Sequence, residues 1–116
     1  MSVEFTVRTE VRDDIDAIQR VNDLAFGTSG EGKLVDRLRA DGLVISSVVA
    51  IANGEVIGHA LFSELLIDST GGEIRAAALA PVAVLPDCQG RGVGSTLIRE
   101  GLNHCRGASV DAVIVL

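Results

Sequence analysis

Apolar and polar positions follow two periods along this chain, and these periods predict where strands and helices lie. Residues 3–8 alternate between apolar and polar side chains, which is typical of a half-buried strand. After Asp13 and Asp14, which favour a helix N-terminus, apolar residues recur at steps of three and four and predict a helix that ends near Phe26. A second short helix is predicted over residues 31–40. Its residues expected to face inward are Leu34, Val35 and Leu38.

The second half of the chain reads mainly as strands. Two long apolar stretches, residues 43–52 and 55–67, flank Asn53 and Gly54, which are a strong signal for a two-residue hairpin. The elements predicted next are a turn over 68–72, a strand over 74–85, a helix over 93–106 and a strand over 110–116. The last run is almost wholly apolar, which predicts a strand parallel to its predecessor and buried on both faces. The order β-α-α-β-β-β-α-β predicts a single α/β domain over residues 1–116, built on a mixed sheet.

A glycine-spaced loop, Gln89-Gly90-Arg91-Gly92-Val93-Gly94, stands between the strand over 74–85 and the helix that follows. The first turn of a helix has N–H groups without partners in the helix, and with the helix dipole they form an anion site. A P-loop is excluded because it would need a lysine at the end of this loop. A dinucleotide fingerprint is excluded because its third glycine would fall on Ser95 or Leu97.

The pattern that does fit is Gln-x-x-Gly-x-Gly, formed by Gln89, Gly92 and Gly94. With the preceding Pro-Val-Ala-Val-Leu-Pro strand and the amphipathic helix after it, this pattern resembles the acetyl-CoA motif of the GNAT acetyltransferase superfamily. The resemblance extends over nearly the whole chain. It implies that backbone N–H groups of the loop hold the pyrophosphate, and that residues 82–84 run beside the pantetheine arm and acetyl group. The cofactor-binding residues implied are Val82, Ala83, Val84, Gln89, Gly90, Arg91, Gly92, Val93, Gly94 and Ser95.

The activity implied by the resemblance is transfer of an acetyl group from acetyl-CoA to a primary amine by direct attack. The amine would belong to a small molecule or to a protein. Glu64 lies late in its strand, near where this family often places a water-relayed base; a solvated acid at a strand end is the alternative. The loop cation Arg91 either contacts phosphate or is solvated. Pro81 is consistent with the splay of the fourth and fifth strands in this family, and also with an edge position.

Two features leave a second function open. The family continues beyond its fifth strand with a helix whose tyrosine usually acts as the general acid, whereas this chain has no Tyr and its pattern stops at that strand. We therefore expect the domain to be C-terminally incomplete. The alternative to an active acetyltransferase is a truncated or degenerate acyl-CoA-binding module without turnover.

Charge and composition exclude several other classes. The net charge of −6 argues against nucleic acid or an anionic membrane as the partner, and an acidic surface could favour a cationic amine. No apolar run reaches the ~18 residues of a membrane span, and no signal sequence is evident, so a cytoplasmic location is expected. No metal site is predicted, because Cys88 and Cys105 lack metal-ligand spacing. Among the remaining reactive types, Cys88 is expected to be an inert loop residue, His59 a core histidine and His104 a surface residue.

The run over residues 110–116 also predicts association. It is too apolar for an exposed sheet edge, and an unpaired apolar edge recruits another strand. We expect a homodimer, an exchange of segments or aggregation, unless a further segment or another chain covers this edge.

Overall fold

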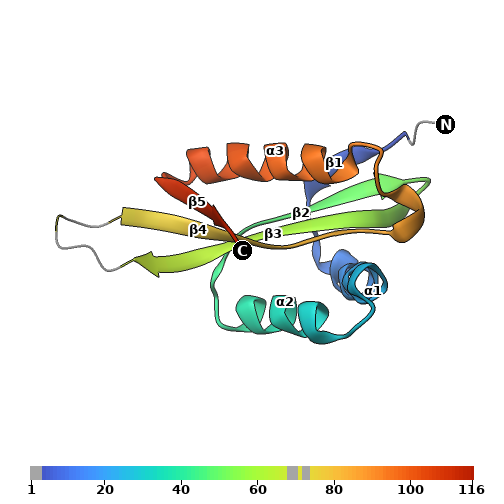
Figure 1. Ribbon diagram of the computed structural model, residues 1–116, viewed down its shortest axis with the longest axis horizontal. Helices are drawn as coiled ribbons and strands as arrows, with labels where there is room; N and C mark the ends of the chain where they lie inside the picture. The colour runs from blue at the N-terminus through green and yellow to red at the C-terminus, as the bar shows by residue number, and fades with distance from the viewer. Residues whose placement is uncertain (1–3, 68–70, 72–73) are drawn as a thin grey trace.

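The computed structural model describes residues 4–67, 71 and 74–116, and it contains one five-stranded sheet with helices on both faces (Figure 1). The predicted turn over 68–72 lies outside the described residues except for residue 71. The strands are β1 (Thr6–Thr9), β2 (Val44–Ala52), β3 (Glu55–Ile67), β4 (Ile74–Val84) and β5 (Ala112–Val115). The α-helices are α1 (Ile15–Phe26), α2 (Gly30–Ala40) and α3 (Val93–Gly107), and two short 3-10 turns are η1 (Arg12–Asp14) and η2 (Pro86–Cys88).

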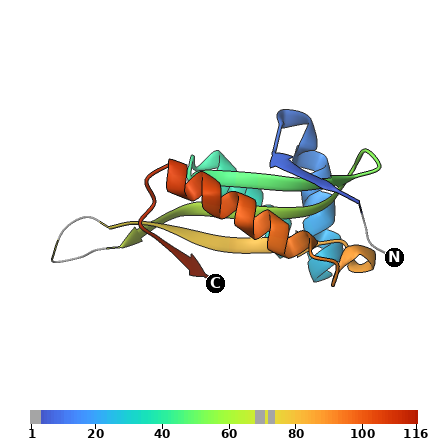
Figure 2. The same ribbon diagram turned by 90° about the horizontal axis from the view of Figure 1, so that it is seen from above.

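The predicted order of elements is confirmed, and so is the mixed sheet. The strands lie side by side in the order β1-β2-β3-β4-β5; all neighbouring pairs are antiparallel except β4 and β5, which are parallel. The helix α3 crosses one face of the sheet, while α1 and α2 cover the other (Figures 1 and 2). In the described chain no helix has both the length and the apolar character needed to cross a membrane.

The hairpin between β2 and β3 forms at the predicted residues. Asn53 and Gly54 have φ angles of 52° and 75°, so both occupy the left-handed region that a type I′ turn requires. Asparagine and glycine are the residues that adopt this conformation at least cost. The turn sets the register of the central antiparallel pair, in which Ala52 lies opposite Glu55.

The sheet separates two apolar layers. Phe62 and Leu97 are central to the layer under α3, whereas Ile18, Val35 and Leu61 pack in the layer under α1 and α2. Phe62 and Leu61 are neighbours on β3, so alternation along the strand sends their side chains into different layers. Each layer therefore contains a fully buried side chain from the middle of the same strand.

A bulge in β4 opens the sheet at one point. Ala60 pairs with Val82 but Phe62 pairs with Leu79, so one residue of β3 faces both Ala80 and Pro81. Pairing between β4 and β5 runs only from Ala76 to Leu79 and ends where this bulge begins. Leu79 directs its carbonyl to Leu116 N on the β5 side, whereas Leu85 N bonds Ile57 O on the β3 side. The N–H and C=O groups of successive residues in a strand point to alternate sides. Those of Val82 and Val84 therefore point away from β3, to the edge of β4 that β5 leaves free.

Two expectations about burial are wrong. The strand β5 is not buried on both faces: Val113 is half-buried in the layer under α3, whereas Ile114 on the opposite face is 39% exposed and Val115 is 73% exposed. Leu34 does not join the core and is 44% exposed, because Val35 is the residue of α2 that turns fully inward. Leu34 instead faces the cavity described below.

Candidate active site

The glycine loop has the backbone conformation that its sequence predicts. Gly90 and Gly92 have φ angles of 75° and 83°, a region that residues with side chains rarely occupy, and Gly92 is the N-cap of α3. Gln89 is exposed, and its side-chain Nε2 donates a hydrogen bond of 3.0 Å to the carbonyl of Val84. Gln89 therefore positions the glycine loop by holding it to the end of β4. Arg91 lies exposed between the two glycines.

The first turn of α3 presents backbone donors beside this loop. The helix begins its ladder with Thr96 N bonding Gly92 O at 3.1 Å, so the amides of Val93, Gly94 and Ser95 precede the first bond. The side chain of Val93 is buried, so only its backbone can serve a ligand. A Cβ built on Gly94 would meet only Val84 Cγ2, at 3.8 Å. Packing within the chain therefore does not require a glycine at 94, whereas close approach of a ligand to these amides would.

A cavity of about 500 Å³ opens at the bulge of β4. It reaches from the junction of α1 and α2, across the edge of β4, to α3 and the end of the chain. The described residues that line it are Phe26, Glu31, Leu34, Leu79, Ala80, Pro81, Val82, Ile98, Val115 and Leu116. Most of this lining is apolar, and the free main-chain edge of β4 forms part of its wall.

The loop and the cavity lie along one continuous surface. Gly94 and Ile98 are four residues apart in α3, so they share one face of the helix. A Cβ at Gly94 would lie 3.8 Å from Val84 Cγ2 at the edge of β4, and Ile98 lines the cavity with Val82. A ligand with its phosphates at the helix N-terminus has a direct route along the edge of β4 into the cavity. The sequence-predicted residues 82–84 and 89–95 are thus brought together.

Glu64 is not brought to that surface. Its carboxylate forms an ion pair of 2.6 Å with Arg75, and Arg75 also hydrogen-bonds the carbonyl of Ala108 just beyond the C-terminal end of α3. The glycine loop stands at the N-terminal end of the same 15-residue helix, which is about 22 Å long at 1.5 Å per residue. The carboxylate hydrogen bond raises the pKa of Arg75. The catalytic role of Glu64 stays a prediction, but its position favours a structural role at this end of the sheet.

A buried polar chain crosses the layer under α1 and α2. His59 is fully buried; its Nε2 lies 2.8 Å from Ser47 Oγ and its Nδ1 lies 3.2 Å from Asn22 Nδ2. The Nδ2 atom of Asn22 can only donate, so His59 Nδ1 accepts, His59 Nε2–H donates to Ser47, and Ser47 donates to the carboxylate of Glu10. Burial lowers the pKa of His59 to about 4, the charge of Glu10 opposes this shift, and Arg39 adds to it. His59 is the satisfied, neutral core histidine that the sequence predicts.

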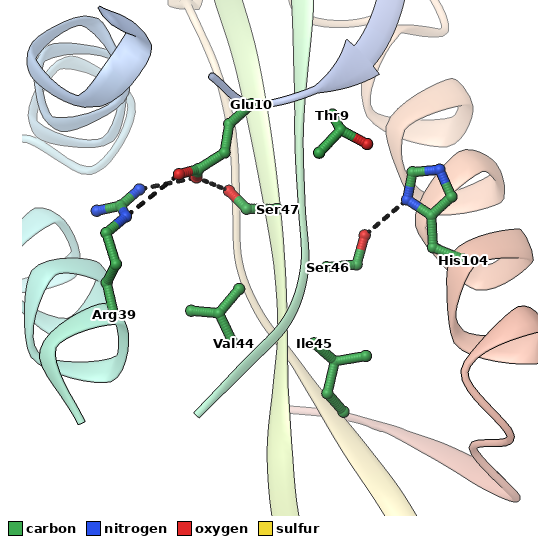
Figure 3. Close-up of a pocket in the computed structure, with 8 residues that line it drawn as sticks. All are labelled: Thr9, Glu10, Arg39, Val44, Ile45, Ser46, Ser47 and His104. Carbon is green, nitrogen blue, oxygen red and sulfur yellow. Dashed lines mark hydrogen bonds and ion pairs between the residues drawn. The ribbon is translucent and has the colours of Figure 1, made fainter. Parts of the chain in front are cut away.

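A second cavity, of about 430 Å³, lies over the part of β2 that extends beyond β1 (Figure 3). Ser46 and Ser47 are neighbours in β2 and point to opposite faces of the sheet. On one side, Ser47 and Arg39 both bond Glu10; on the other, Ser46 Oγ lies 2.9 Å from His104 Nδ1 (Figure 3). The polar groups of this cavity thus belong to two separate networks that do not converge on one point.

The expectation that His104 is a surface residue is wrong. It is half-buried against Ser46, and its Nε2 lies 3.3 Å from Glu100, one turn earlier in α3, so it is no simple surface residue. The pattern along α3 places His104 beside the buried Cys105, but only tertiary packing shows that β2 brings a serine to it. Burial also raises the pKa of the Cys105 thiol, which keeps it protonated and inert.

The sheet that splays at Ala80 and the glycine loop that caps α3 together define an acyl-CoA N-acyltransferase fold. The family model described as Acetyltransferase (GNAT) family matches residues 15–116, and the chain belongs to this family. The uncharacterized N-acetyltransferase YjhQ of Escherichia coli K12 is 36% identical over 114 residues, and the uncharacterized N-acetyltransferase YhbS of the same strain is 32% identical over 111 residues. These matches cover 97% and 95% of this chain but 63% and 65% of the relatives. The chain thus spans just under two thirds of their length.

Two solved structures similar to this chain are also GNAT family acetyltransferases. A GNAT family acetyltransferase from Brucella melitensis, solved in complex with acetyl-CoA, is 40% identical with a TM-score of 0.89; the match covers 97% of this chain and 75% of that one. YhbS from Escherichia coli, solved in complex with CoA, is 31% identical with a TM-score of 0.88, over 100% of this chain and 64% of that one.

Proposed function

We propose that this protein binds acetyl-CoA and transfers the acetyl group to a primary amine. The observation that supports this most directly is the continuous surface from the open amides of α3, along the free edge of β4, to the cavity at its bulge. Two relatives with at least 31% identity were solved with acetyl-CoA or CoA, which is a ligand of the length and charge that such a surface suits.

In this proposal each cofactor residue acts mainly through its backbone. The pyrophosphate lies on the amides of Val93, Gly94 and Ser95, at the positive end of the helix dipole. Gly90 and Gly92, whose φ angles are left-handed, turn the chain so that the phosphates can approach these amides. Arg91 lies between the two glycines and contacts the phosphates. The pantetheine arm follows residues 82–84, of which Ala83 is buried and contributes backbone only. Gln89 holds the loop in place through its bond to β4.

The reaction would proceed at the bulge of β4. The lone pair of the neutral amine forms a bond to the thioester carbonyl carbon, and the negative charge that develops on its oxygen is stabilised by a backbone N–H such as that of Val82, which points to this edge. The C–S bond then breaks, the nitrogen loses a proton and the thiolate takes one up. The products are the N-acetylated amine and CoA thiol.

A second candidate is an acyl-CoA-binding module without turnover. It is favoured by one observation, the ion pair with Arg75 that holds Glu64 at the far end of α3 from the loop. Both candidates use the same loop and differ only in the chemical step.

One pair of measurements tests the proposal. Calorimetric titration with CoA and acetyl-CoA should give saturable binding, and release of free thiol from acetyl-CoA should depend on an added amine. Binding together with amine-dependent release supports the acetyltransferase. Binding without release for every amine would leave the second candidate, and the absence of binding would refute both.

We also propose that a polypeptide of these 116 residues associates with itself through β5. The support is the exposed apolar surface at this strand, where Ile114, Val115 and Leu116 are each more than a third exposed. In the described part of the chain β5 pairs with β4 alone, so its other edge is open to a second strand.

A further inference from the structure

The residues of β3 change in size along the line where α3 crosses the strand. Gly58 and Phe62 both face the layer under α3, and they differ by a whole aromatic side chain. The large residues Val93 and Leu97 of α3 lie over Gly58. Further along the helix, Gly101 lies over Phe62. At both points a glycine on one element meets a large side chain on the other, so α3 can lie close to the strand.

A side chain at Gly58 would be too close to α3. A Cβ built there would lie 3.0 Å from Leu97 Cδ1 and 3.1 Å from Val93 Cγ1, whereas carbon atoms in ordinary contact are about 3.5–4.0 Å apart. The carbonyl oxygen of Ala83 lies 3.3 Å from the same position, on the side of β4. Val93 and Leu97 are both fully buried in a closely packed layer, so the added atom would push the helix away from β3.

Val93 joins this contact to the proposed cofactor site. Its side chain lies against Gly58, and its backbone amide is one of the three that precede the first hydrogen bond of α3. Gly58 is also paired with Val84, the residue of β4 to whose carbonyl Gln89 holds the glycine loop. The distance from the amides of the first turn to the edge of β4 therefore depends on how closely α3 lies on Gly58.

We propose that Gly58 is a positioning residue for acetyl-CoA: because it has no side chain, the phosphate-binding amides of α3 lie at the right distance from the edge of β4. This inference rests on the cofactor site proposed above and adds a residue that does not touch the cofactor. A ligand with its phosphates at residues 93–95 and its arm along residues 82–84 must span both subsites at once. A shift of part of an ångström between them weakens its binding, because it can no longer contact both in a relaxed shape. A ligand that contacts the amides alone moves with the helix and loses little.

Two ligands of different reach test this proposal without turnover. CoA carries a diphosphate and a pantetheine arm, whereas ADP carries the diphosphate without the arm. Calorimetry measures the affinity for CoA directly and the affinity for ADP by competition against CoA. Gly58→Ala should weaken binding of CoA by about 3- to 30-fold, less than the ~100-fold that a misplacement of about 1 Å can cost. Its affinity for ADP should stay within about twofold of that of the unchanged protein.

Two further variants separate position from stability. Val35→Ala removes buried methyl groups from the layer under α1 and α2, so it should destabilise the fold without moving α3, and CoA affinity should stay within about twofold. Leu97→Val removes the Cδ1 atom nearest to the new Cβ, so Gly58→Ala combined with Leu97→Val should bind CoA more tightly than Gly58→Ala alone. If Gly58→Ala does not fold, the double variant is compared with Leu97→Val. It should still bind CoA less tightly, because Val93 Cγ1 remains in the way.

The outcomes separate this inference from the function on which it rests. Equal affinity for CoA in the unchanged protein and in Gly58→Ala would overturn the role of Gly58. Equal losses for CoA and ADP would also overturn it, because the amides alone would then be affected. A loss in Val35→Ala as large as that in Gly58→Ala would show that stability controls binding, and would overturn it too. In these three cases the unchanged protein still binds CoA and the proposed cofactor site stands, whereas no binding by the unchanged protein would refute the site itself.

Discussion

Phe62 occupies the space that a side chain at Gly101 would need. A Cβ built on Gly101 would lie 1.9 Å from Phe62 Cε1 and 2.6 Å from its Cζ. The ring of Phe62 is fully buried in the layer under α3, so a side chain at 101 would force the ring or the helix to move. The absence of a side chain at 101 lets the axis of α3 approach β3 closely.

Replacing that glycine should therefore destabilise the fold. Gly101→Ala should lower the free energy of unfolding by about 1–3 kcal/mol, because overpacking exceeds the gain in helix propensity. Chemical denaturation followed by circular dichroism measures this change. Gly107→Ala, in the same helix, is the matched control, since a Cβ built there meets nothing within 4 Å. It should be neutral or slightly stabilising, and equal losses in both variants would contradict the packing argument.

The cofactor loop gives a second prediction. Gly94→Val should weaken binding of CoA by at least about 10-fold, because the new side chain blocks the amides of the first turn of α3 at a cost of about 1–3 kcal/mol. Gly94 is a better test than Gly92, whose φ of 83° would strain any valine. Calorimetry measures the affinity, and Gly107→Val at the other end of α3 is the control. Unchanged affinity in Gly94→Val would refute the assignment of the loop.

The parts of this structure that the sequence predicted are those that depend on local pattern. Periods of two and of about 3.6 predicted the strands and helices, and Asn53-Gly54 predicted its hairpin, because each signal lies within a few residues. The spacing of Gln89, Gly92 and Gly94 predicted the loop for the same reason. These features need no knowledge of what packs against them.

The parts that were missed depend on contacts between distant segments. Ser47 and His59 lie on adjacent strands, while Glu10 reaches them from the end of β1, and no local pattern announces that the three meet. Glu31 reads as an ordinary first-turn acid, and only the fold shows that it lines the cavity at the bulge of β4. The strand β5 was expected to be buried because its composition is apolar, but composition does not say whether a neighbour covers it.

Glu64 gives a third prediction, about catalysis. Glu64→Gln should leave the turnover of acetyl-CoA and amine within a few-fold of the unchanged protein, because its carboxylate is paired with Arg75 at the far end of α3. Thiol release measured across pH tests this expectation. A loss of ~10²-fold or more, the range for general-base catalysis, would instead restore Glu64 as the base. The thermal midpoint of Arg75→Met, which breaks the same pair, shows how far the change is structural.

Self-association through β5 gives a fourth prediction. A polypeptide of these 116 residues should scatter light at low micromolar concentration with a mass above its 12.1 kDa. Ile114→Lys places a charge on the exposed face of β5 and should shift the mass toward that of a monomer. A sharp monomer mass for the unchanged chain, with slow amide exchange along Ala112–Val115, would show that something in the chain protects this edge.

His59 gives a prediction about stability and pH. Burial holds its pKa in the folded state at about 4, below the ordinary value of 6.5. Between these values the unfolded chain binds a proton that the folded chain does not, so the free energy of unfolding falls as the pH falls. The loss should begin near pH 6.5 and reach on the order of 3 kcal/mol by about pH 4. Asp14, whose pKa is lowered chiefly by its hydrogen bond to Arg8, adds a further loss only as carboxylates protonate below that range.

Urea denaturation at several pH values between 7 and 4 measures this slope. His59→Gln keeps an amide able to bond Ser47 or Asn22 but cannot take up a proton, so its stability should depend on pH much less in this window. His104→Gln changes the half-buried histidine that bonds Ser46 and serves as the control, since it leaves the buried chain intact. If the curves of His59→Gln and the unchanged protein ran parallel from pH 6.5 to 4, the neutral state of His59 would not be the cause. The hydrogen-bond direction inferred for the buried chain would then be wrong as well, because a charged imidazole donates from both nitrogens and leaves no acceptor for Asn22 Nδ2.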